Sequence, residues 1–111
     1  MVKEVKYGYA LQKDKALQAL AQQRMEQLEE VLEDAAPEVT AEWDQGNDGM
    51  FRPVVTLRLS DSSGWATGVF DPKELENPSR MRYRLRFLWG DLLQVGRHQL
   101  LQQLIGNGQE G

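Results

Sequence analysis

Apolar residues recur at three- and four-residue spacing between about Lys13 and Ala35, with Gln, Glu and Arg between them. On a helix this spacing gathers them on one stripe, about a third of the circumference wide. The stripe comprises Leu17, Leu20, Ala21, Leu28, Val31, Leu32 and Ala35. Ala36-Pro37 predicts the end of the helix, because the residue before a proline is disfavoured in helical geometry. The segment therefore predicts an amphipathic helix packed on a core.

Between residues 39 and 70 the pattern changes to alternation of apolar and polar residues, which is typical of half-buried strands. The alternating runs cover 39–44, 51–60 and 65–70, and segments 45–49 and 61–64 separate them. Both separating segments are rich in Gly, Asn, Asp or Ser, which favour turns. The sequence therefore predicts a three-stranded antiparallel meander.

Helical spacing returns after Asp71-Pro72-Lys73-Glu74, which has the cap, the proline and the acidic residue of a helix start. Asn77-Pro78 repeats this signal and begins a long element that runs to about Ile105. In this element Met81, Leu85, Leu88, Trp89 and Leu92 form one core stripe, so we expect Trp89 to be buried against the sheet. The overall prediction is an α+β fold, with helices near 13–36 and 78–105 on one face of the meander.

Past Gly90 and Gly96 the apolar stripe of this last helix moves to Leu93, Leu100 and Leu104, about a quarter turn from the first stripe. The helix therefore either kinks near these glycines or is apolar on two faces. A second apolar face is explained either by a partner subunit or by coverage from the N-terminal segment.

The ends of the chain give weaker signals. Residues 1–11 are either a flexible arm or a weak strand, and the glycine-rich segment 106–111 predicts a helix stop and a disordered tail. At 111 residues the chain is expected to form a single domain.

Composition predicts a soluble, cytoplasmic protein. The net charge is −4, apolar residues make up 41% of the chain, and cysteine is absent, so disulfides and thiolate metal sites are excluded. No apolar run is long enough to suggest a membrane span, and the N-terminus lacks the apolar stretch of a secretory signal.

The segment from Arg80 to Arg97 is strongly basic, since Asp91 is its only acidic residue. Read as a strand, residues 80–87 would present a comb of arginines suited to a phosphate backbone. The capping signal and the apolar stripe favour a helix. If the two long helices run antiparallel, the arginines meet Glu29 and Glu33 near the end of the first; the alternatives are an external acidic partner and a solvated face.

No residues in the sequence suggest catalysis. His98 is the only histidine and lies in no metal-binding or triad spacing, so we expect no metal site, no cofactor and no enzymatic activity.

We therefore predict a non-enzymatic protein-interaction module, an accessory or assembly factor, that binds a protein through the C-terminal helix and that self-associates as a homodimer or binds another chain. The alternative is a nucleic-acid-binding protein that uses the basic segment, against which the overall acidity argues. The candidate binding residues are Arg80, Arg82, Tyr83, Arg84, Arg86, Phe87 and Arg97.

Overall fold

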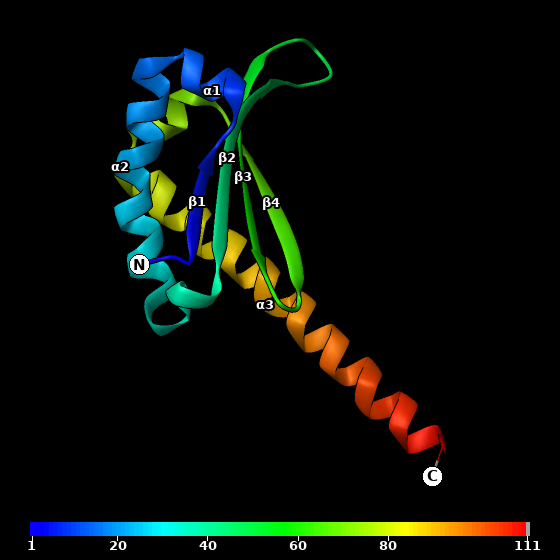
Figure 1. Cartoon of the computed structure of the whole chain (residues 1–111). Helices are drawn as coiled ribbons and strands as arrows, with labels where there is room; N and C mark the ends of the chain where they lie inside the picture. Colours follow the sequence, from blue (N-terminus) through cyan, green and yellow to red (C-terminus); the bar gives the residue numbers. More distant parts are fainter. Residues whose placement is uncertain (111) are drawn as a thin grey trace.

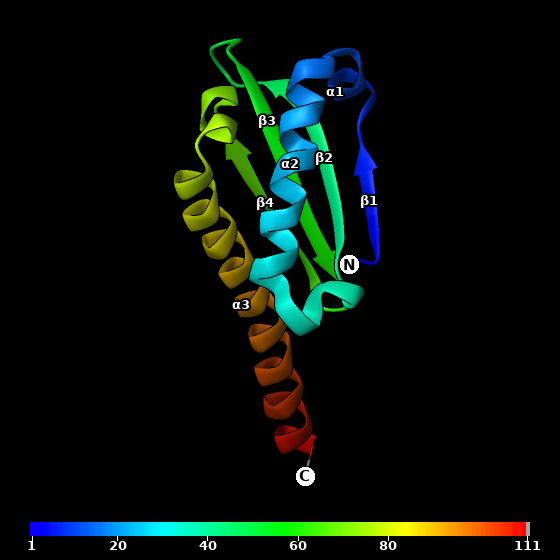
Figure 2. The same ribbon diagram turned by 90° about the vertical axis from the view of Figure 1, so that its left-hand side faces the viewer.

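In the computed structural model, two long helices lie on one face of a four-stranded sheet (Figures 1 and 2). The structure describes residues 1–110, and side-chain exposure is described for residues 1–98 and 100–105. The elements are β1 (Glu4–Tyr7), α1 (Tyr9–Lys13), α2 (Lys15–Leu32), the 3-10 helix η1 (Glu33–Glu38), β2 (Thr40–Asn47), β3 (Pro53–Asp61), β4 (Gly64–Phe70), the 3-10 helix η2 (Pro72–Glu76) and α3 (Pro78–Glu110). The predicted α+β class is confirmed.

The sheet has one more strand than the sequence predicted. Its order is β1-β2-β3-β4, with β2, β3 and β4 in the predicted antiparallel meander. The prediction of a purely antiparallel, three-stranded sheet was wrong, because β1 adds to the edge in parallel with β2. A parallel neighbour needs a long crossover, which α1 and α2 provide. Of the two readings of residues 1–11, the structure shows the strand over Glu4–Tyr7.

The core lies between the sheet and the two helices. The inward positions of the meander are buried and alternate with exposed ones, as the pleat of a strand requires. Trp43 is at the centre of this layer, where its indole N–H points at Met25 Sδ, 2.9 Å away, and its ring lies 6.5 Å from that of Phe70. On α3 the predicted stripe is buried at Met81, Leu85, Leu88 and Leu92. Trp89 was expected in the core but is only half-buried at its edge.

The first long helix ends earlier than predicted. It ends at Leu32, and the chain tightens into η1, which contains Pro37. Glu33 adopts a positive φ of 52° at this junction. Arg24 is a charged residue that is buried on α2. Its guanidinium donates to Gln27 Oε1 at 2.9 Å, while its Nε–H has no hydrogen-bond partner among the residues whose side chains the structure describes.

The C-terminal helix α3 is one continuous rod from Pro78 to Glu110 that projects well beyond the sheet (Figure 1). Of the two predicted alternatives, the structure therefore shows a helix with two apolar faces and no break at Gly90 or Gly96. The tail predicted as disordered over 106–111 overlaps this helix up to Glu110, and Gly111 lies outside the described residues. The helices α2 and α3 run in the same general direction, not antiparallel (Figure 2).

Within residues 1–110, none of the helices has both the length and the hydropathy needed to cross a membrane.

Candidate functional site

The exposed side of α3 carries seven of the large apolar side chains that are exposed in the described part of the chain. We call it the outer face of α3. It turns away from the buried stripe, and its large apolar side chains are each 50–62% exposed: Tyr83, Phe87, Leu93, Leu100, Leu101, Leu104 and Ile105. Scattered exposed apolar residues are common on soluble proteins, but several of them gathered on one side of a single helix are typical of an interaction surface.

Tyr83 and Phe87 begin the outer face, over the part of α3 that packs on the sheet. They are one helical turn apart, and their rings pack at 6.0 Å between centroids with an interplanar angle of 42°. They border a shallow hollow whose floor is Gly90 and whose far side is formed by Asp91 and Gln94. A Cβ added at Gly90 would meet no atom within 4 Å, so there is room above the helix at this point.

The second half of the outer face belongs to the projecting end of α3. Here Leu100, Leu101, Leu104 and Ile105 lie in the part of the helix that extends past the β3–β4 turn (Figures 1 and 2). The N-terminal segment does not cover them, since β1 pairs with β2 at the far edge of the sheet. The predicted second stripe included Leu93, Leu100 and Leu104 but missed Leu101 and Ile105. Leu101 and Ile105 lie about five helical turns after Tyr83 and Phe87, respectively, and therefore on the same side of the helix. The sequence could have revealed this spacing.

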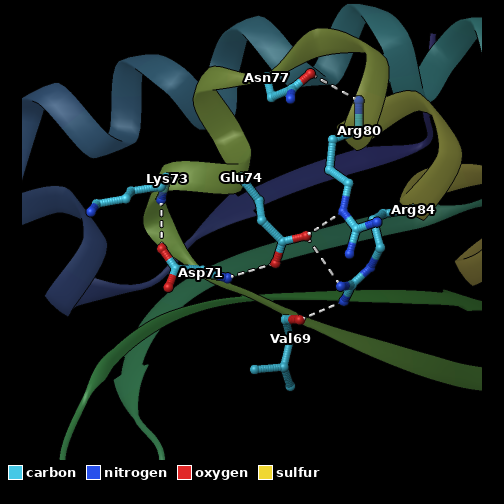
Figure 3. Close-up of polar contacts among 7 residues, drawn as sticks. All are labelled: Val69, Asp71, Lys73, Glu74, Asn77, Arg80 and Arg84. Carbon is cyan, nitrogen blue, oxygen red and sulfur yellow. Dashed lines mark hydrogen bonds and ion pairs between the residues drawn. The ribbon is translucent and has the colours of Figure 1, made fainter.

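Arg80 and Arg84 are held by a carboxylate that the sequence analysis did not assign to them (Figure 3). Glu74 Oε2 accepts from Arg80 Nε and from an Arg84 terminal nitrogen, both at 3.2 Å. The other oxygen, Oε1, accepts from the Asp71 backbone N–H at 3.0 Å and completes the predicted capping box of η2. Glu74 therefore joins the cap of η2 to the first turns of α3.

Arg84 makes the largest number of specific contacts in the basic segment. Besides its bond to Glu74, its second terminal nitrogen donates to the Val69 carbonyl at 2.6 Å, and its guanidinium lies 4.8 Å from the centre of the Phe70 ring. Its side chain is 29% exposed, much less than that of Arg80 or Arg82. Arg84 is thus a packing residue that ties α3 to β4.

The remaining arginines are more exposed. Arg82 reaches Glu30 of α2 at 3.3 Å, so the internal pairing involves Glu30, not the expected Glu29 and Glu33. Arg86 and Arg97 are exposed on α3, and neither forms a salt bridge within the part of the chain that the structure describes. The structure therefore does not bring the seven candidate residues into one site. It separates Arg80, Arg82 and Arg84, which pair internally, from Tyr83, Arg86, Phe87 and Arg97, which face solvent.

The face of the sheet opposite the helices is a second surface that sequence reasoning missed. Trp65 is 56% exposed there, and the Arg58 guanidinium stacks on its ring at 4.5 Å. Lys6 pairs with Glu4 and Glu42 on the same face, at 3.9 and 3.6 Å. Acidic and basic groups both lie on this face, where Lys6 is paired with two carboxylates and Arg58 stacks on an aromatic ring. At the end of β1, burial raises the pKa of the Tyr7 phenol.

No chemically reactive arrangement stands out among residues 1–110. Among the side chains at 1–98 and 100–105, no three from His, Asp or Glu lie together in a way that could hold a metal ion. His98 lies on the exposed surface of α3, where its Nε2 is 3.0 Å from Gln102 Nε2.

Comparison with known proteins found no matching family model, no matching curated protein and no matching solved structure.

Proposed function

We propose that the protein is a non-enzymatic interaction module that binds another polypeptide through the outer face of α3. One observation supports this proposal above the rest: the seven large apolar side chains of this face are at least half exposed along a single helix. An apolar helix face that its own domain leaves uncovered suits the helix-in-groove or helix-on-helix mode of protein recognition.

The projecting end of α3 supports the same proposal. This projecting end would be only marginally stable as an isolated helix in water, because most helical stability in proteins comes from packing of an apolar face. The large apolar side chains of the projecting end are 50–60% exposed, so a bound polypeptide that covered them would stabilise this part of the helix.

The nucleic-acid alternative is less well supported by the geometry. Arg80 and Arg84 are engaged by Glu74, and Arg82 is engaged by Glu30. Phosphate contacts require available cations, and only Arg86 and Arg97 of the basic segment offer charge without a described salt bridge. The net negative charge of the protein also repels a phosphate backbone at long range.

Site-specific photo-cross-linking in the producing cells tests the proposal. We expect benzoylphenylalanine at position 87 to form covalent adducts with a polypeptide, because Phe87 lies in the proposed interface. Thr67, exposed on the opposite face of the sheet, is the matched control position and should give few adducts. Adducts that shrink on nuclease digestion would favour the nucleic-acid alternative, and equal yields from both positions, or none from position 87, would contradict the proposal.

A further inference from the structure

We infer that the polypeptide on the outer face of α3 is the same face of a second copy, antiparallel to the first. The inference rests on the function proposed above and names its partner. In this arrangement a twofold axis passes beside α3 at the level between Val95 and Gly96. The projecting end of each α3 then covers the hollow beside Tyr83 and Phe87 of the other copy.

The spacing of the outer face fits a two-helix seam. Six positions follow one another at alternating three- and four-residue spacing, the repeat by which two helices keep a shared seam. They are Phe87, Gly90, Gln94, Arg97, Leu101 and Leu104. At about 1.5 Å per residue the seam runs for roughly 26 Å, from above the sheet to the projecting end.

Antiparallel pairing about this axis places an apolar residue or a glycine opposite an apolar residue in the outer layers of the seam, and a polar residue opposite a polar one at its centre. Phe87 meets Leu104 of the second copy, and Gly90 meets Leu101, for which the open space above Gly90 leaves room. Gln94 meets Arg97, so the polar residues at the middle of the seam face each other and can form a hydrogen bond. The apolar layers therefore lie towards the ends of the seam and the polar layer at its centre.

The two flanks of the seam are also complementary. A twofold axis perpendicular to both helices places the same flank of the two copies side by side. On one flank, Leu93 therefore lies beside Leu100 of the second copy. On the other flank Asp91 lies beside His98, an acid beside a base. Asp91 and His98 are two turns apart within one helix and do not contact each other there.

Parallel pairing lacks this fit. In a parallel pair in register, Gly90 would face Gly90 and leave a void, and Arg97 would face Arg97, which is repulsive. The observations therefore favour the antiparallel copy over a parallel one. The seam identifies the partner as a second copy, because its residues are complementary to the same residues taken in the opposite order.

Sedimentation equilibrium tests whether the second copy binds. We expect the wild type to show a monomer–dimer equilibrium and Leu101→Glu to raise its dissociation constant about 100-fold, because each dimer would bury two carboxylates in apolar layers. Gln102→Glu adds the same charge one residue further, on a side turned away from the seam, and should change the constant less than about threefold.

Cysteine pairing tests the orientation, and the absence of natural cysteine gives a clean background. In an oxidised mixture of Gly90→Cys and Leu101→Cys chains we expect a disulfide between the two different chains, with little cross-linking of either variant alone. Cross-linking of each variant with itself would instead show a parallel pair and overturn the inference.

The outcomes also separate this inference from the proposed function. A wild type that stays monomeric at high concentration would overturn the second copy as partner. If position 87 then still cross-linked to a different protein, the interaction module would stand with another partner. If it cross-linked to none, both proposals would fail.

Discussion

Replacing Trp43 with alanine is expected to lower the free energy of unfolding by about 3–5 kcal/mol, the largest loss we anticipate from any single truncation in this chain. The side chain is 1% exposed and contacts both Met25 of α2 and Phe70 of β4. Its removal would leave a cavity where the helix layer meets the sheet. Because small domains are stable by only about 5–15 kcal/mol, this loss would be readily seen in urea unfolding.

Trp65→Ala is the matched control for this prediction. Trp65 belongs to the same sheet but faces solvent, and its one described partner is the Arg58 guanidinium. An exposed cation–π pair contributes about 0.5–1 kcal/mol, so its loss should stay near that value. The half-buried Trp89 should fall between the two. Equal losses for Trp43 and Trp65 would contradict the assignment of the core to the helix-covered face.

Arg84→Ala is expected to lower the free energy of unfolding by about 1–3 kcal/mol. The change removes a charge-assisted hydrogen bond to Glu74, the bond to the Val69 carbonyl and the contact with the Phe70 ring. Partial exposure of the pair to solvent keeps the loss below that of a buried ion pair. Denaturant unfolding at low and high salt would measure both the loss and its ionic share.

Arg86→Ala provides the comparison from the same segment of α3. Arg86 is exposed and forms no salt bridge among the described residues, so its truncation should change stability by less than about 0.5 kcal/mol. If the two substitutions had the same effect, the basic segment would act as a uniform solvated face, and the structural role given to Arg84 would be wrong.

Most of the fold could be predicted from the sequence, because its signals are local. The stripe from Leu17 to Leu32, the alternation in β3 and the capping box at Asp71 each depend on neighbours a few residues away. Strand β1 could not be predicted firmly, because it has only four residues and its partner β2 lies beyond a crossover of two helices.

The candidate site was predicted in part for a similar reason. Tyr83 and Phe87 stand out from the sequence because they point away from the core stripe of their own helix. The role of Glu74 could not be seen in the sequence, because it depends on how η2 folds back beside the first turns of α3. The glycines after Ile105 suggested a helix stop, and α3 extends to Glu110.

Amide hydrogen exchange over residues 97–105 tests most directly whether a polypeptide covers the outer face of α3. Side chains 97, 98 and 100–105 are exposed on the end of α3 that projects beyond the sheet (Figure 1), so in a lone chain the amides of this stretch should exchange rapidly. We predict that they are protected in the concentrated wild type and in Gln102→Glu, and that Leu101→Glu removes the protection. Equally fast exchange in the wild type and in Leu101→Glu would contradict the account.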